Sequence, residues 1–318
     1  MLTDYSENQM KTIDINDQDA LNFIGELEGA DFVSPSTTTK QVIKKFANKT
    51  LIGEFLPWSE TNKEIQFRPC EVSLWGGYNG SGKSQLLGQI AAWNLSQSIW
   101  AIASLEMPYL QSHIRMLRQV SASRIPSDEF IYEFNNWADN KLWYYDRLDS
   151  VPSQVMLGII IYAASELKVN HFIIDSLVKC RIGREDYDKQ MQFVEKLSAI
   201  AKQYKIHIHL VHHMRKKENE EVMPTKFDFR GAGEITDLVD NCFIFFRNKK
   251  KERLLRQNKH TEETHNQFDQ FLKCEKQRYG EWEGIKGLWF HQDSLQYTSR
   301  QNQTMLYNRL QLKNESIK

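Results

Sequence analysis

The stretch that decides the fold is Gly77-Tyr78-Asn79-Gly80-Ser81-Gly82-Lys83-Ser84, which matches the phosphate-binding loop pattern G-x-x-x-x-G-K-[ST] at every constrained position. Its glycines let the backbone turn so that successive N–H groups point inward at phosphate oxygens. Lys83 can reach the β- and γ-phosphates, and the Ser84 hydroxyl can ligate Mg²⁺. Residues 71–75 predict a buried strand before the loop, and residues 85–94 predict a helix after it. A chance glycine turn is the alternative, but this context favours binding of ATP or another nucleoside triphosphate with Mg²⁺.

The composition sets limits on partners and compartment. Lys+Arg and Asp+Glu both total 41 in 318 residues, so nucleic-acid contact would need a local basic surface. The cysteines are far apart, which argues against a zinc site or a disulfide framework and fits a reduced compartment. The N-terminus is unlike a signal or transit peptide, and the most apolar stretch, 156–164, is too short to cross a bilayer, which takes ~20 residues. We expect a soluble, cytoplasmic protein without a membrane partner, in the host cytoplasm if it is viral.

From about residue 40, strand and helix patterns alternate, which predicts an α/β fold with a mostly parallel central sheet flanked by helices. The predicted strands are 72–75, 99–104, 142–145, 171–175, 206–212 and 241–247. The predicted helices lie near 84–95, 109–121, 127–140, 153–168, 187–204 and 233–239. An antiparallel extension is predicted from residues 268–276, 287–291 and 295–298. One ATPase domain over 40–300, with an arm over 1–39 and a tail over 301–318, accounts for the chain.

The N-terminal arm is acidic, with Lys11 as its single base. Its composition predicts disorder for residues 1–16. Residues 17–33 have an apolar spacing compatible with a short amphipathic helix. Such a helix could dock on a neighbouring subunit, and disorder is the alternative.

Two acids follow predicted strands, at the sheet edge where open parallel sheets hold their ligands. Asp175 ends the apolar stretch 171–174, as expected of the carboxylate that orients Mg²⁺ beside a phosphate loop. Glu106 follows the strand 99–104 and could polarise the water that attacks the γ-phosphate. The alternatives are an ordinary strand-capping aspartate and a solvated glutamate.

In combination, these segments resemble the RecA-like hexameric replicative helicases of the DnaB type, which include the helicase half of phage primase-helicases and Twinkle. The resemblance covers about residues 50–300 in the right order. The motifs that carry it are Ser104-Leu105-Glu106-Met107-Pro108, the strand His171 to Ser176, Leu210 to Arg215, Arg247-Asn248, Asp228 to Ile235 followed by Asp240, and Lys276-Gln277-Arg278-Tyr279-Gly280. Cys70 departs from the family, which usually has Gly at that position.

The resemblance implies a role for each motif. Glu106 would be the catalytic glutamate, and His213 the γ-phosphate sensor at its strand end. Lys276 and Arg278 would reach the nucleotide of the adjacent subunit in a hexameric ring, and Arg247 would lie against the base. For Arg278, a solvated ion pair on the rim is the alternative. The chain has no room for a primase domain, so we expect a separate primase, polymerase or single-strand-binding protein as a partner.

Residues 214–233 predict a functional loop, because the segment is long and has little periodicity. In a ring its cations would face the central channel and follow the backbone of single-stranded DNA. The residues assigned to DNA binding, partly through the resemblance, are Lys216, Lys217, Lys226, Arg230, Gly231 and Gly233. Glutamates in the same segment leave a plain surface loop as the alternative.

The histidines of 207–213 cluster on one predicted strand, but no carboxylate or cysteine completes a metal-ligand set. The leading hypothesis is therefore an NTP-hydrolysing ring helicase that translocates on single-stranded DNA and unwinds duplex DNA at a replication fork. One alternative is a RecA/RadA-type recombinase, which would form open filaments. The other is a non-translocating ATPase that acts as a loader or regulator.

Overall fold

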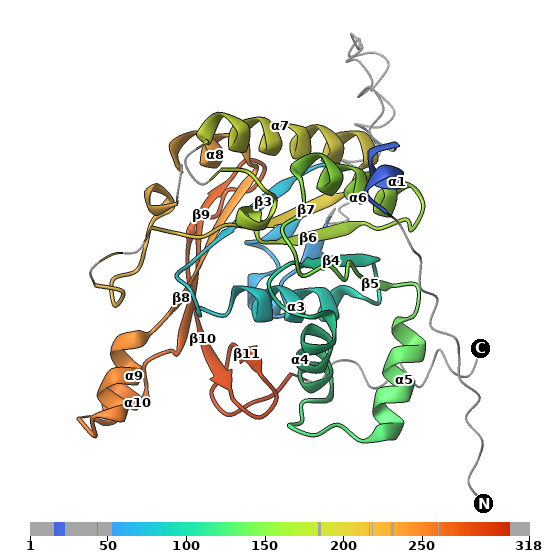
Figure 1. The fold of residues 1–318 in the computed structure, drawn as a ribbon. Helices are drawn as coiled ribbons and strands as arrows, with labels where there is room; N and C mark the ends of the chain where they lie inside the picture. The colour runs from blue at the N-terminus through green and yellow to red at the C-terminus, as the bar shows by residue number, and fades with distance from the viewer. Residues whose placement is uncertain are drawn as a thin grey trace, which may run out of the picture.

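A central sheet with helices on both faces organises the molecule (Figure 1). The computed structural model describes residues 16–22, 43, 53–183, 186–215, 217, 219–229, 232–259 and 261–305. Within these residues the strand order of the main sheet is β11-β10-β9-β8-β3-β7-β6-β4-β5. The strands from β8 to β5 are mutually parallel, and β9, β10 and β11 are antiparallel to their neighbours. This confirms the predicted α/β class, including its antiparallel extension.

The strands lie close to their predicted ranges. Their bounds are β3 Val72–Gly76, β4 Trp100–Ser104, β5 Leu142–Tyr144, β6 His171–Asp175, β7 His207–Val211, β8 Asn241–Arg247, β9 Gln270–Gln277, β10 Gly284–His291 and β11 Gln296–Thr298. A small separate sheet pairs β1, Glu54–Phe55, with β2, Gln66–Phe67.

The helices and short 3-10 turns connect these strands. Their bounds are α1 Asp17–Asn22, η1 Ser59–Thr61, α3 Lys83–Asn94, α4 Tyr109–Ser121, α5 Asp128–Ala138, α6 Ser153–Ser165, η2 Leu177–Lys179, α7 Tyr187–Tyr204, η3 Lys226–Asp228, α8 Ala232–Leu238, α9 Lys249–Arg256 and α10 Glu262–His265. None of the described helices combines the length and the apolarity that a bilayer crossing requires.

Two apolar cores lie on opposite faces of the sheet, because successive strand residues point to opposite sides. Leu74 of β3 faces the core formed with α6, α7 and α8. The next residue, Trp75, faces the other core, formed with α3, α4 and α5. Both side chains are fully buried. The sheet is therefore held from both sides, which leaves the ends of its strands as the places for polar chemistry.

A layer of histidines crosses the sheet within the second core. Trp100 stacks on His171 with ring centroids 4.2 Å apart, and His171 Nδ1 lies 3.2 Å from His209 Nε2. His207 Nε2 lies 2.8 Å from the Ser73 hydroxyl. Burial lowers the pKa of His207 to about 4 and that of the other two rings well below the usual value. These rings are neutral packing elements of the sheet.

The N-terminal helix α1 packs on α6 of the same chain. Ala20 is fully buried there, and a Cβ at Gly158 would clash with the Ala20 carbonyl group. Arg147 forms an ion pair with Asp17. Residues 23–33 of the predicted arm helix lie outside the described residues, and docking on a neighbouring subunit stays a prediction.

The charged segment after β8 forms two helices for which the sequence analysis assigned no structure. Asn248 caps α9 by accepting a hydrogen bond from the Lys251 N–H, and Thr261 caps α10. In Figure 1 the pair projects from the lower end of β8 and β9, away from the helical layers. This projection borders the phosphate-loop end of β8.

Candidate nucleotide-binding and hydrolysis site

The predicted phosphate loop connects β3 to α3, with glycines where the backbone requires them. Gly77 has φ +153° and Gly82 has φ +92°, a region that side chains rarely adopt. A Cβ at Gly77 would clash with the Phe245 carbonyl oxygen, and one at Gly82 with the Tyr297 hydroxyl. Conformation and space therefore both require these two glycines, and the N-terminus of α3 faces the turn that they make.

Lys83 is folded back into the loop at the first position of α3. Its Nζ donates to the Gly77 carbonyl at 2.9 Å and to the Tyr78 carbonyl at 3.1 Å. Burial lowers the pKa of Lys83 to about 8, although the charges of Asp175 and Glu106 act in the opposite direction. The ammonium group is thus held by neutral carbonyls where an arriving phosphate would give it a stronger partner.

Ser84 and Asp175 form an oxygen-rich pair at the edge of the sheet. Asp175 ends β6 with 8% of its surface exposed, and it accepts a hydrogen bond from the Ser84 hydroxyl. Burial raises the pKa of Asp175, and the Ser84 hydrogen bond opposes that shift. A hydroxyl and a carboxylate fit Mg²⁺, which prefers oxygen ligands and keeps much of its coordination for water and phosphate. The donor chemistry of the site therefore fits the cofactor that the sequence predicts.

Glu106 lies one residue beyond the segment in which β4 follows β6. The backbone N–H of Leu105 still donates to the Asp175 carbonyl at 2.9 Å, which fixes the height of Glu106 above the sheet. Its Oε1 accepts from the Ser176 hydroxyl at 2.9 Å and from His213 Nε2 at 3.3 Å. The His213 contact, followed by that with Ser176, lowers the pKa of Glu106 to about 2 against the opposing effect of burial. The carboxylate is therefore ionised at neutral pH, as a base that polarises water must be.

The predicted nucleotide residues Lys83, Ser84, Glu106, Asp175 and His213 thus come together at one end of the parallel strands. Ser176, which touches two of them, was missed. Its signal was a hydroxyl side chain directly after the strand-ending aspartate.

Comparison with known proteins gives the same fold. A family model described as "AAA domain" matches residues 66–219. A solved structure of the ATPase domain of a helicase has a TM-score of 0.69 at 13% identity, covering 84% of this chain and 99% of that chain. A DnaB-like replicative helicase, described with its interactions with primase, has a TM-score of 0.64 at 14% identity, covering 84% of this chain and 67% of that chain. No curated protein matches the sequence. The fold is that of a DnaB-type helicase ATPase domain.

This DnaB-type fold keeps Lys276 and Arg278 away from the phosphate loop of their own chain. β8 is parallel to β3, and Asn241, at the start of β8, pairs with Gln277 on the antiparallel β9. Lys276 and Arg278 therefore lie where β3 begins, whereas the loop follows the end of β3. A full strand length separates the two groups.

Each of the two cations is fixed at that opposite end. The Lys276 Nζ donates to three carbonyls at the C-terminus of α8, those of Thr236, Asp237 and Val239, at 2.8–2.9 Å. Arg278 contacts the buried Asp240 carboxylate at 3.2 Å and the Asp237 carbonyl at 3.1 Å. Arg278 is nevertheless an exposed residue. The arrangement holds a positive group outward at the rim of the sheet.

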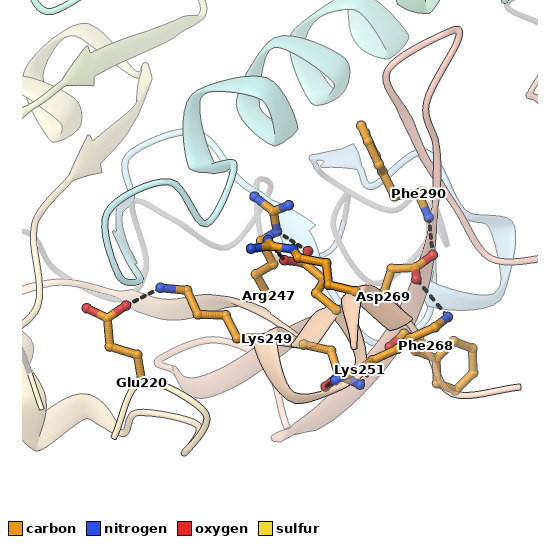
Figure 2. A network of polar contacts seen from close by, with 10 residues as sticks. Glu220, Arg247, Lys249, Lys251, Phe268, Asp269 and Phe290 are labelled. Atoms are coloured by element: carbon orange, nitrogen blue, oxygen red, sulfur yellow. Dashed lines mark hydrogen bonds and ion pairs between the residues drawn. The ribbon is translucent and has the colours of Figure 1, made fainter. Parts of the chain in front are cut away.

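Arg247 ends β8 on the phosphate-loop side, as the sequence predicts. It pairs with Glu252, and a cavity of about 720 Å³ lies between it and the loop tip at Asn79 and Gly80. Figure 2 shows Arg247 beside Lys249, which points toward Glu220 and pairs with it. The cavity is therefore open beside the phosphate loop and bordered by charged groups of both signs, where a nucleoside would extend.

The predicted DNA loop is described in part. Lys217 forms an ion pair with Asp228 at 2.7 Å, and the Lys226 ammonium lies 5.7 Å from the centre of the Phe227 ring, a side chain that is 73% exposed. The Tyr78 hydroxyl of the phosphate loop donates to the Val222 carbonyl at 3.2 Å. This hydrogen bond joins the DNA loop directly to the phosphate loop.

The other predicted DNA contacts have less structural description. Lys216, Arg230 and Gly231 lie outside the described residues, and Gly233 lies within α8. Sequence reasoning also missed the part of α9, whose Arg253 pairs with Glu221 of this loop at 2.6 Å. The cation-rich run after Asn248 was the available signal.

Proposed function

We propose that this chain is the motor of a replicative DNA helicase. It would hydrolyse ATP with Mg²⁺ within a hexameric ring, translocate on single-stranded DNA and unwind duplex DNA at the fork. The observation that carries the proposal is the separation of the hydrolytic groups. Lys83, Glu106 and Asp175 share one end of the sheet, whereas the exposed Arg278 is fixed at the other end. A ring brings the second end of one subunit to the first end of the next.

The chemistry follows from the groups at the first end. Lys83 and the loop amides bind the β- and γ-phosphates, and Ser84 and Asp175 would hold Mg²⁺, which neutralises phosphate charge when bound. The ionised Glu106 accepts a hydrogen bond from the attacking water and orients it toward the γ-phosphate. His213 Nε2 is within reach of the same edge and would exchange its contact with Glu106 for one with the γ-phosphate.

The positive charge that phosphoryl transfer still needs would come from the neighbouring subunit through Arg278, supported by Lys276. Hydrolysis then depends on the geometry of the interface between two subunits. Because the DNA loop contacts the phosphate loop through Tyr78, a change at the nucleotide reaches the channel. This gives a physical route from hydrolysis to movement of DNA.

The proposal extends to partners and location. One structural neighbour is described as a helicase that interacts with primase. We include a separate primase, a polymerase or a single-strand-binding protein as candidate partners of this chain, and a cytoplasmic location.

Unwinding of a forked duplex, with ATP and Mg²⁺ at low salt, tests this function directly. The expected result is strand separation by the wild-type chain and none by Lys83→Ala, because that variant loses the phosphate-binding ammonium group. Electron microscopy with nucleotide should show closed rings. Helical filaments would favour a recombinase, and a folded chain that hydrolyses ATP without ever unwinding the fork would contradict the proposal.

A further inference from the structure

A serine that belongs to no recognised motif lies at the centre of the candidate hydrolytic groups. Ser176 directly follows Asp175 and is fully buried. Its hydroxyl oxygen is 2.9 Å from Glu106 Oε1 and 3.3 Å from His213 Nε2, and these two atoms are themselves 3.3 Å apart. The three polar atoms form a closed triangle, and Ser176 is its fully buried corner.

The hydrogen atoms of this triangle can be placed from its surroundings. His213 Nδ1 is buried and has no hydrogen-bond partner among the described residues, so the ring proton belongs on Nε2. His213 Nε2–H then donates toward Glu106 and the Ser176 oxygen, while the Ser176 O–H donates to Glu106. Glu106 Oε1 therefore receives two donors, one from a fixed hydroxyl and one from the candidate sensor.

The two donors differ in what they can do when ATP binds. The Glu106 side chain is 43% exposed, and that of His213 is 19% exposed. His213 can turn its N–H toward an incoming phosphate, which would remove one donor from the carboxylate. Ser176 has no such freedom, because it is buried in the turn that follows β6. Its hydroxyl is then the remaining donor that keeps Glu106 from swinging toward solvent.

From this geometry we propose that Ser176 is a positioning residue for Glu106. Its hydroxyl holds the carboxylate at the phosphate edge while His213 exchanges its contact with Glu106 for one with the γ-phosphate. The inference rests on the proposed hydrolytic role of Glu106. The other charged groups that act on Glu106 or share its surroundings are Lys83, Asp175 and Lys179. Among the described residues, none of these groups replaces the hydroxyl as a donor to Glu106.

Single-turnover ATP hydrolysis by Ser176→Ala tests the inference. The loss of one positioning hydrogen bond is expected to lower the rate about tenfold. The dissociation constant for a fluorescent ATP analogue should stay unchanged, because the hydroxyl does not touch the phosphate loop. Ser198→Ala is the matched control, since it removes a buried hydroxyl of α7 that has no hydrogen-bond partner among the described residues, and it should keep the wild-type rate.

Combination with Glu106→Gln separates positioning from a general structural role. If Ser176 acts through Glu106, then Ser176→Ala should not slow the already impaired Glu106→Gln variant any further. A wild-type rate for Ser176→Ala, an equal loss in both backgrounds, or a loss confined to nucleotide affinity would each overturn the inference. Ser176→Cys, with similar size and a weak donor, repeats the comparison if the alanine variant melts early. Normal hydrolysis by Glu106→Gln would instead refute the proposed catalytic role itself.

Discussion

The two ends of the parallel strands hold their positive charges in different ways. At the phosphate-loop end, Lys83 is buried against two backbone carbonyls, and its pKa falls to about 8 because it has lost water without gaining a full ion pair. At the other end, Arg278 is exposed and is already paired with the buried carboxylate of Asp240. The first cation awaits a negative ligand, whereas the second is a finished and outward-facing donor. A hydrolytic site assembled from both needs two copies of the chain.

Mixing two inactive variants gives the strongest test of this contrast. Arg278→Ala should bind ATP normally and lose about 10³–10⁵ in hydrolysis rate, the typical value of an arginine that stabilises phosphoryl transfer from a neighbour. Lys83→Ala should be inactive for the opposite reason, the loss of its own phosphate site. Mixed rings contain interfaces that join an intact Lys83 to an intact Arg278. The mixture should therefore recover DNA-stimulated ATPase activity that neither variant has alone.

The controls for this mixture are each variant alone at the same total concentration and a double variant, Lys83→Ala with Arg278→Ala, mixed with either single variant. The double variant should restore nothing in either mixture. Near-normal turnover by Arg278→Ala alone, or mixtures that stay inactive in verified rings, would show that the two ends do not meet across an interface.

Within the phosphate-loop end, Glu106→Gln removes the proposed base and leaves its size. Hydrolysis should fall about 10²–10⁴-fold, the usual contribution of a positioned general base, while ATP binding is retained. Rapid-quench measurement of the chemical step with bound ATP separates this effect from binding. Equal weakening of binding and hydrolysis would indicate that Glu106 holds the nucleotide and does not activate water.

The sequence predicted the phosphate-loop end better than its surroundings, for a physical reason. Buried parallel strands such as 171–175 are continuous apolar runs, and the acid that ends such a run stands out from its neighbours. Ser176 has no such signal, because its role depends on Glu106 and His213, which arrive from two other strands. Likewise, α9 contains a run of lysines whose burial depends on distant residues. Lys251 is 4% exposed because it meets Asp269 at 2.7 Å and lies 4.7 Å from the Trp289 ring centre.

Figure 2 shows that this missed contact is part of a longer connection, in which Asp269 accepts hydrogen bonds from Lys251 and from the Phe290 N–H. Only the folded sheet brings β9 and β10 to α9. Patterns along the chain predict elements and the residues at their ends. They do not predict partners that lie in other elements.

The titration of Lys83 gives a smaller and sharper test of the same end. With a pKa of about 8, the free lysine is about half charged at pH 8, whereas phosphate binding should restore the full charge. ATP binding should therefore take up about half a proton near pH 8. The uptake should grow as the pH rises toward the usual lysine value. Calorimetry in buffers of different ionisation enthalpy measures this uptake, and Lys83→Met should abolish it.

The same shift has a consequence for stability without nucleotide. Between pH 8 and the ordinary lysine pKa of 10.5, the unfolded chain binds more protons at Lys83 than the folded chain does. The contribution of this group to folding stability therefore increases with pH across that window. A decrease that depends on Lys83 would contradict the burial of an unpaired ammonium group.

The smallest expected effect concerns the DNA loop, where two predicted contacts differ in their partners. Lys217 is engaged by Asp228 at 2.7 Å, whereas the Lys226 ammonium lies near the exposed Phe227 ring. Each phosphate contact to single-stranded DNA contributes about 0.7 to the slope of log K against log salt. Lys226→Ala should therefore lower the slope by about 0.7. Lys217→Ala should lower it less, because DNA must first displace a carboxylate from that lysine. Fluorescence anisotropy of a labelled oligonucleotide over a salt series measures both slopes, and equal slopes for wild type and Lys226→Ala would remove this lysine from the DNA path.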